Sequence, residues 1–229
     1  MKETTHIVPV GHTKETIIES LRRHPLGRVI LVTGDNPGVE SERKARQTIL
    51  EVRKALGTVP AQEVYVNLND IPSIALTIIE IIREEDKQGR QVLLNLSGSL
   101  RSLDIACYMA ALATKSQVYV GIPSYRKDKI TGVDHIQDIP LFPTKIYQKE
   151  KKLILEKLGR QGKTLEQLTT QLKTKVKKGT QAYLTEKSRI SHHIKDLKKE
   201  GLIETSREGK TLNIQLTTIG KIYVEGLNV

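Results

Sequence analysis

The sequence has little of what stabilises secreted or membrane-embedded chains. Its 229 residues include a single cysteine, Cys107, which excludes an internal disulfide and any zinc site built from several cysteines. Cys107 lies among small residues with helical spacing, so we expect a buried core thiol and not a nucleophile. No apolar run approaches the roughly 20 residues that span a bilayer, and the first residues do not form a signal peptide. We therefore expect a soluble cytoplasmic protein without a membrane partner.

The chain also lacks the common nucleotide-binding fingerprints. Neither G-x-G-x-x-G nor the P-loop pattern G-x-x-x-x-G-K-[ST] occurs, which weakens the dinucleotide-binding and P-loop NTPase interpretations. His192 and His193 are adjacent and would point about 100° apart on a helix, which makes a shared metal site unfavourable. We expect no metal site, no cofactor and no catalytic residue.

What the chain does have is positive charge, gathered at one end. Residues 144–229 contain 19 Lys/Arg and 9 Asp/Glu, whereas residues 1–143 contain 18 and 17. Nearly all of the formal net charge of +11 therefore lies in the last third of the chain. Because charge distribution determines partners more than architecture, a basic module beside a neutral one is typical of a protein that binds a polyanion, most often nucleic acid.

Five apolar, β-branched runs in the first half predict buried strands. They are 7–10, 29–32, 64–66, 92–94 and 118–120. Continuous runs of this kind suit strands buried on both faces of a parallel sheet. Between them, three segments have helical spacing, with inward faces formed by Ala45, Ile49, Val52 and Leu56, by Ile74, Ile78, Ile81 and Ile82, and by Leu103, Ala106, Ala110 and Ala113. This alternation predicts an α/β fold with a Rossmann-like, mostly parallel sheet.

The pattern changes after Ile122. Residues 124–142 predict a short hairpin that turns at Thr131-Gly132, followed by a further strand. Residues 147–162 predict a basic amphipathic helix with Leu153, Ile154 and Leu158 inward. This helix is either a linker or the first helix of a second domain, and we favour the latter. We therefore place one domain at 1–143 and a second at 144–229.

The second domain has the order helix, helix, helix, hairpin. A short helix at 165–172 precedes one that Thr185 would cap, with Ile190, Ile194 and Leu197 inward. Gly201 ends that helix, and strands at 202–205 and 211–216 flank a turn. The run SRISHHIKDLKKEGLIET…EGKTLNIQLTTIGK resembles the MarR/ArsR-like winged helices of bacterial and archaeal regulators.

A winged helix-turn-helix domain of this plan places the outward face of its third helix in the DNA major groove, with the wing on the backbone. Because that face mixes Ser and His with Arg and Lys, we favour duplex DNA over the alternative of a protein-binding domain with a solvated basic face. The predicted DNA-binding residues are Lys187, Arg189, Ser191, His192, His193, Lys195, Arg207 and Lys210.

Small polar residues follow three of the predicted strands. In open α/β sheets, ligands bind beyond the carboxyl ends of the strands. The loop after the fourth strand is the most informative, since Ser and Gly leave backbone N–H groups accessible and Arg101 would sit in a helical first turn that favours an anion. The alternative is a tight glycine turn with a solvated Arg101. The predicted ligand-binding residues are Gly11, His12, Thr13, Gly34, Asp35, Asn95, Ser97, Gly98, Ser99, Leu100 and Arg101.

The whole chain resembles the CARF (CRISPR-associated Rossmann fold) transcription regulators. The resemblance rests on N-L-S-G-S-L-R at 95–101, the polar loop after the first strand and the winged helix. It implies a homodimer whose paired CARF domains hold a cyclic oligoadenylate, commonly cyclic tetra-adenylate, across the two-fold axis. The family's S-G-G-x-R-type loop falls on Ser97, Gly98, Ser99 and Arg101. Ser99 replaces the second Gly, which affects the expected ligand size and affinity more than the ligand class.

The resemblance leaves alternatives open. A CARF effector or ring nuclease would cleave RNA or the cyclic ligand, and Ser97, Lys127 or Lys129 could assist that cleavage. The nuclease patterns R-x4–6-H and E-x-K have only poor matches, in Arg189-x3-His193 and at 150–152. A regulator that senses another nucleotide or a small anion is the third hypothesis.

Overall fold

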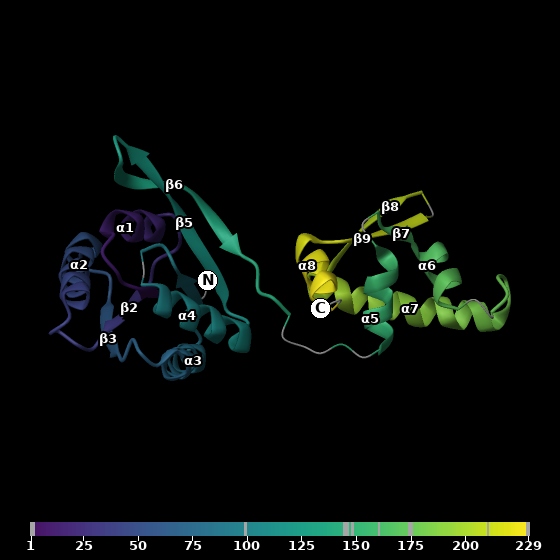
Figure 1. Ribbon diagram of the computed structural model, residues 1–229, viewed down its shortest axis with the longest axis horizontal. Helices are drawn as coiled ribbons and strands as arrows, with labels where there is room; N and C mark the ends of the chain where they lie inside the picture. Colours follow the sequence, from purple (N-terminus) through teal and green to yellow (C-terminus); the bar gives the residue numbers. More distant parts are fainter. Residues whose placement is uncertain are drawn as a thin grey trace. The chain divides into compact units, whose positions relative to one another are not determined.

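The structure is a computed structural model that describes residues 3–98, 100–143, 147, 149–159, 161–173, 176–209 and 211–227, with backbone alone at 225–227 (Figure 1). The chain divides into two compact units, Met1–Leu141 and Phe142–Val229. Each unit has hydrophobic clusters of its own. Among the described residues, no helix is long and apolar enough to cross a membrane.

A six-stranded sheet forms the centre of the first unit. Its strands are β1 (Thr4–Pro9), β2 (Arg28–Gly34), β3 (Ala61–Val66), β4 (Gln91–Asn95), β5 (Gln117–Arg126) and β6 (Lys129–Ile139). They lie in the order β3-β2-β1-β4-β5-β6, with β1 to β5 parallel and β6 antiparallel to β5. The predicted α/β fold with a mostly parallel sheet is confirmed. Because β4 returns to the side of β1, the winding direction reverses between these two strands.

Helices cover both faces of this sheet. They are α1 (Lys14–Arg22), α2 (Glu40–Leu56), α3 (Ile71–Lys87) and α4 (Arg101–Thr114). The helices α1 and α2 share one buried cluster with Val8 and Leu31, whereas α3 and α4 share another with Ile7 and Ile30. Successive strand residues point to opposite faces, so the two clusters lie on opposite sides of the sheet.

The predicted inward faces of these helices are buried, with two differences. Ala113 is exposed and Ile81 is only half-buried. Cys107 is fully buried, as predicted, and burial raises the pKa of its thiol.

The prediction of a turn at Thr131-Gly132 is wrong. β5 continues to Arg126, and the chain turns at Lys127 and Asp128, whose φ angles of 48° and 61° match a type I′ hairpin. Gly132 lies within β6 near a register shift and faces the carboxylate of Glu19, which leaves no room for a Cβ. A turn without glycine has no strong local sequence pattern. Gly132, which is required for close packing against Glu19, was therefore mistaken for a turn residue.

The described part of the second unit combines four helices with a small sheet. Its elements are α5 (Lys149–Leu158), β7 (Lys163–Thr164), α6 (Leu165–Leu172), α7 (Gln181–Lys199), β8 (Ile203–Glu208), β9 (Thr211–Leu216) and α8 (Thr218–Leu227). The strands lie in the order β7-β9-β8, all antiparallel. One apolar cluster joins α5, α6, α7 and this sheet. The predicted burial of Ile190, Ile194 and Leu197 is confirmed, and Gly201 has the expected positive φ of 72°.

Two predictions for this unit are wrong. The helix α7 begins at Gln181 and not after Thr185, because the Thr180 side chain accepts the cap hydrogen bond from the Tyr183 N–H at 3.3 Å. Within the helix, Thr185 donates to the Gln181 carbonyl. On α5, Leu153 is exposed. The neighbouring Leu155 takes the expected buried position.

Candidate ligand site and nucleic-acid interface

The loops after β1 and β4 meet at the point where the winding direction reverses. The Gly11 N–H donates to the Gly98 carbonyl at 2.6 Å. A Cβ on Gly98 would lie 2.4 Å from Ile17 Cγ1 and 2.8 Å from the Thr13 carbonyl oxygen, so only glycine fits there. In open α/β sheets this reversal point is where ligands bind. The structure thus brings together the residues predicted on these two loops.

Asn95 and Ser97 hold the second loop from within. Asn95 is fully buried, and its Nδ2 donates to Ser20 Oγ at 2.8 Å. Its Oδ1 accepts the Ser97 N–H at 3.0 Å and the Ser97 hydroxyl. The Gly121 N–H in turn donates to Ser97 Oγ at 2.8 Å. The hydrogen-bonding groups of both side chains are therefore engaged inside the protein. The two side chains position the loop, and a ligand would contact other groups on its outer surface.

Arg101 is the first residue of α4 and is exposed. Within the part of the chain that the structure describes, its guanidinium forms no hydrogen bond or ion pair. Leu100 precedes it in an extended conformation and is half-buried, and Ser99 lies outside the described residues. The start of α4 therefore presents an exposed cation at the positive end of the helix dipole, an arrangement that favours an anion.

The predicted residues after β2 are engaged with α2. Arg46 Nη2 donates to the carbonyls of Gly34 at 3.2 Å and Asp35 at 2.9 Å. The side chain of Glu42 fills the space over Gly34 and accepts the Asn36 N–H at 2.7 Å. Gly34 is consequently buried, whereas Asp35 is exposed. The structure does not join these two residues to the pair of loops at β1 and β4.

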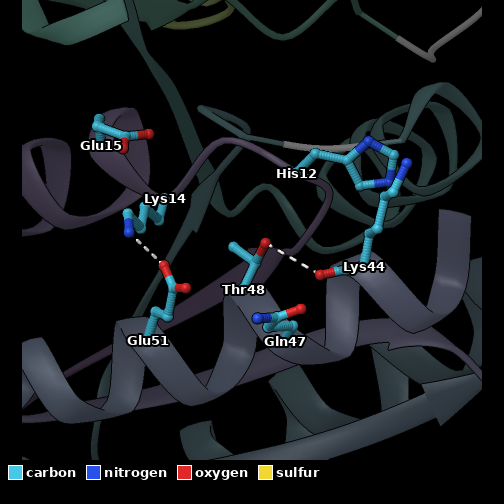
Figure 2. Close-up of a pocket in the computed structure, with 7 residues that line it drawn as sticks. All are labelled: His12, Lys14, Glu15, Lys44, Gln47, Thr48 and Glu51. Carbon is cyan, nitrogen blue, oxygen red and sulfur yellow. Dashed lines mark hydrogen bonds and ion pairs between the residues drawn. The ribbon is translucent and has the colours of Figure 1, made fainter.

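His12 connects the β1 loop to a pocket on the α1–α2 side. Its Nε2 lies 2.9 Å from the Ser41 carbonyl oxygen. Figure 2 shows the pocket, a cavity of about 270 Å³. It is lined by His12, Lys14, Glu15, Lys44, Gln47, Thr48 and Glu51. Of the predicted residues only His12 belongs to it, and its other members could have been found only from the pairing of α1 with α2. Lys14 is ion-paired with Glu51, which raises the pKa of Lys14.

A buried polar layer lies under the two loops, between α1 and the sheet. His6 is fully buried, with Nε2 2.9 Å from the Pro25 carbonyl and Nδ1 2.8 Å from the Tyr119 hydroxyl. A carbonyl can only accept, so Nε2 carries the proton and Nδ1 accepts from Tyr119. Burial lowers the pKa of His6 to about 4, which keeps the ring neutral, and burial raises the pKa of Tyr119.

Comparison with known proteins identifies the family of this sheet domain. The family model described as "HFX_2341_N:-like, N-terminal" matches residues 4–126, more than half of the chain. The chain belongs to this family. An uncharacterised protein of Archaeoglobus fulgidus is 26% identical, with 98% of each chain covered.

Among solved structures, two that are similar to this chain hold a cyclic oligonucleotide. Enterococcus italicus Csm6, bound to cyclic hexa-2'-fluoro-hexa-dAMP, is 12% identical, with a TM-score of 0.49 over 88% of our chain and 57% of its own. Can2 from Sulfobacillus thermosulfidooxidans, in complex with cyclic tetra-adenylate, is 14% identical, with a TM-score of 0.43 over 97% and 64%. Our chain thus spans less than two thirds of either structure, and neither similarity bears on what it binds.

The exposed face of α7 differs from the predicted one. Arg189 Nη2 lies 2.6 Å from Glu150 Oε1 and 2.9 Å from Glu186 Oε2. His193 is mostly buried, with Nε2 3.1 Å from Glu150 Oε2. Arg189 is exposed, as predicted, but it is ion-paired with Glu150 on α5. The prediction that His193 lies on the outward face is wrong, because its ring contacts Glu150 and is mostly buried. This carboxylate is 39 residues from Arg189, a distance at which no sequence pattern signals an ion pair.

The remaining predicted residues on α7 are distributed around its open side. His192 and Lys195 are exposed, and Lys187 and Ser191 are half-buried. Two further exposed residues, Ser188 and Lys199, complete a stripe with His192 and Lys195 at spacing i, i+4, i+7 and i+11. Sequence reasoning missed Ser188 and Lys199, although this spacing was available once Ile190 and Ile194 were placed inward.

The hairpin of β8 and β9 presents Arg207 at its tip. Arg207 is exposed, Gly209 turns the chain with a φ of 59°, and Lys210 lies outside the described residues. Among the described residues, no group of three His, Cys, Asp or Glu could hold a metal ion. Glu150, the acid of the E-x-K pattern, is engaged by Arg189, His193 and Lys173.

Proposed function

We propose that this protein is a CRISPR-associated, ligand-responsive transcription regulator. In this proposal the first unit is a CARF domain that binds a cyclic oligoadenylate, with cyclic tetra-adenylate as the expected ring. The second unit is a winged helix-turn-helix domain that binds duplex DNA. Two copies of the chain form a homodimer, in which the units of each chain act together.

The observation that carries the ligand proposal is the free guanidinium of Arg101 beside the joined β1 and β4 loops. The Gly11–Gly98 hydrogen bond fixes those loops at the point where the sheet reverses its winding. Asn95 and Ser97 secure the second loop from below, so its backbone is ready before a ligand arrives. A preorganised loop with one unpaired cation suits a phosphodiester more than a neutral metabolite.

The exposed side of α4 supports the homodimer. Arg101, Ile105 and Met109 are spaced i, i+4 and i+8 and share one face of the helix. Ile105 and Met109 are 51% and 43% exposed, and Leu76 on the neighbouring α3 is 62% exposed. Apolar side chains that gather on a surface favour a protein contact. A two-fold contact there would present two copies of Arg101 to one cyclic ligand.

The second unit supports DNA binding by its charge and its elements. The order α5, α6, α7, β8, β9 is that of a winged helix-turn-helix, in which the third helix enters the major groove. The exposed stripe of Ser188, His192, Lys195 and Lys199 would face the bases and nearby phosphates. Arg207 on the wing would contact the backbone.

Coupling between the two functions requires that the ligand prefer one arrangement of the dimer. A ligand shifts an equilibrium only as far as it binds one state better than the other. Two winged helices must match half-sites about one helical turn apart, so a change in their separation alters DNA affinity.

The decisive experiment is a calorimetric titration of the full-length protein with cyclic tri-, tetra- and hexa-adenylate. We expect saturable binding of one ring size, with one ring per dimer. The Arg101→Ala variant should lose roughly 1.5–3 kcal/mol of binding free energy for each charged hydrogen bond removed. Arg83→Ala, which removes an exposed arginine from α3, is the matched control. Wild-type protein that binds no ring would contradict the sensor proposal.

The same incubations test the alternative that the protein cleaves its ligand or RNA. The Ser97 hydroxyl is engaged by Asn95 and Gly121, so it is poorly placed to assist cleavage. We expect the ring to be recovered intact by mass spectrometry after prolonged incubation. Linear adenylate products that disappear with Arg101→Ala would instead establish a ring nuclease.

A further inference from the structure

The hairpin of β5 and β6 extends well past the rest of the sheet (Figure 1). Tyr119 is the last residue of β5 that pairs with β4, opposite Asn95. β5 then continues for seven residues to Arg126, which is roughly 20 Å at the usual rise of a strand. Because β5 is parallel to β4, this arm leaves the sheet at the same edge as the loops after β1 and β4.

The base of the arm is fixed to α1. The Glu19 carboxylate accepts the Val133 N–H at 2.8 Å. Arg23 donates to the Asp134 carbonyl at 2.9 Å and also to the Val133 carbonyl. Glu19 and Arg23 are themselves ion-paired at 2.9 Å. These contacts hold β6 in place, so the distal part of the arm is presented on a firm support.

The tip of the arm carries an aromatic ring and three cations. Tyr125 is 65% exposed, and Arg126, Lys127 and Lys129 are exposed with it. In the described structure none of these four side chains has a hydrogen bond, ion pair or ring contact. Asp128 is the one carboxylate in the turn, so the tip has a local excess of positive charge.

This availability sets Tyr125 apart from other tyrosines of the chain. Tyr65 is also exposed, but Arg46 lies over its ring at 4.4 Å and its hydroxyl donates to Glu63. Tyr119, Tyr147 and Tyr183 are buried. Tyr125 and the cross-strand pair Arg126 and Lys129 point to opposite faces of the hairpin. A chain that crosses the tip, with a flat face on one side and negative charge on the other, would contact both.

We propose that the hairpin tip is a binding site for an unpaired nucleotide within a phosphodiester chain. The base stacks on the Tyr125 ring, and the flanking phosphates pair with Arg126, Lys127 and Lys129. Stacking on aromatic rings combined with a cationic track is the usual way in which proteins hold single-stranded nucleic acid. The chemistry is common to a linear oligonucleotide and to a cyclic one, and it does not require a ligand at Arg101.

The test uses the absence of tryptophan from this chain, because a Tyr125→Trp variant then carries a single reporter of stacking. We expect saturable quenching of its fluorescence by linear hexa-adenylate RNA or by cyclic tetra-adenylate. Arg126→Gln with Lys129→Gln should weaken the quenching by roughly tenfold or more. These changes should also reduce the slope of log affinity against log salt for the linear RNA by about 1.4. Lys127 is left unchanged because its positive φ supports the turn.

The controls separate this proposal from the sensor proposal. Lys54→Gln with Arg83→Gln removes two exposed cations from α2 and α3 and should leave the quenching unchanged. Quenching by linear RNA that survives Arg101→Ala makes the tip a site of its own. Quenching by the cyclic ring that Arg101→Ala abolishes makes the tip part of the same ligand site. Quenching by neither nucleotide, or an equal loss in the control, overturns the proposal.

Discussion

The two units differ in how their cations are balanced by carboxylates. In the first unit, carboxylates and cations are nearly equal in number, and arginines such as Arg23, Arg53 and Arg90 each face a glutamate. In the second unit cations outnumber carboxylates by about two to one, and Glu150 alone is shared by Lys173, Arg189 and His193. Cations that are paired inside the protein stabilise it, whereas unpaired surface cations raise the local potential for a polyanion. The contrast therefore separates a unit whose charges serve mainly its own structure from one whose charges are directed outward.

Removing the second unit is the strongest test of this contrast. A chain truncated after Leu141 should lose duplex DNA binding altogether, because nearly all of the charge excess is removed. Its own hydrophobic clusters are complete, so it should remain folded by circular dichroism. In the full-length protein, Lys195→Glu with Lys199→Glu should reduce DNA affinity severely, as measured by fluorescence anisotropy. Lys54→Glu with Arg83→Glu changes charge equally on the first unit, and an equal loss there would contradict the contrast.

Within the first unit, the buried carboxylate of Glu85 should have the largest effect on stability. Its side chain is 4% exposed and accepts Arg90 Nε at 2.5 Å, Arg90 Nη2 at 2.9 Å and the Thr5 hydroxyl at 2.5 Å. Burial alone would raise the pKa of Glu85, but the bonds from Arg90 and Thr5 outweigh it and lower the pKa.

Glu85→Gln should therefore lower the free energy of unfolding by about 3 kcal/mol, since removing one partner leaves a poorly solvated charge behind. Chemical denaturation followed by circular dichroism measures the loss. The adjacent Glu84 is exposed and pairs with Lys87 at 3.5 Å, so Glu84→Gln should change little. Equal effects of the two substitutions would mean that burial of the charge is unimportant here.

The contacts of Glu85 join residues that are far apart in the sequence, and contacts of this kind could not be predicted from the sequence. The strands were predictable because residues buried on both faces must be apolar, as at Ile30 and Leu31. The turn at Lys127 and Asp128 was not, since lysine rarely adopts a positive φ and aspartate without a following glycine is a weak turn signal. Asn95 and Ser97 were predicted as ligand residues from their polarity and position. Within the protein, Asn95 bonds to Ser20 and Ser97 to Gly121, and these two partners come from elements that only the fold brings near.

The buried His6 should make the stability of the first unit depend on pH. Its pKa is about 4 in the folded protein and about 6.5 in an unfolded chain, so the unfolded state binds the proton first as the pH falls. Stability is therefore fully present above about pH 6.5 and is lost as the pH falls toward 4. Between pH 7.5 and 5 the expected loss is about 2 kcal/mol. His6→Gln should flatten this part of the profile in denaturation experiments, and a parallel profile would mean that His6 does not carry the effect.

The smallest predicted effect concerns Glu150, and its sign distinguishes the two units most sharply. Removing the buried Glu85 carboxylate from the first unit should weaken folding, whereas Glu150→Gln should strengthen DNA binding. The substitution releases Arg189 and Lys173 from their shared acceptor and adds one unit of positive charge next to α7. If one released cation gains a phosphate, the slope of log affinity against log salt should steepen by about 0.9. Anisotropy titrations over a range of salt concentrations measure this change.

Glu156→Gln, on the same helix, makes the same change of charge with only a 4.0 Å pair to Lys152, so it should have the weaker effect. If the two variants behave identically, net charge alone governs binding; if Glu150→Gln weakens binding, the Glu150 network itself shapes the surface that contacts DNA.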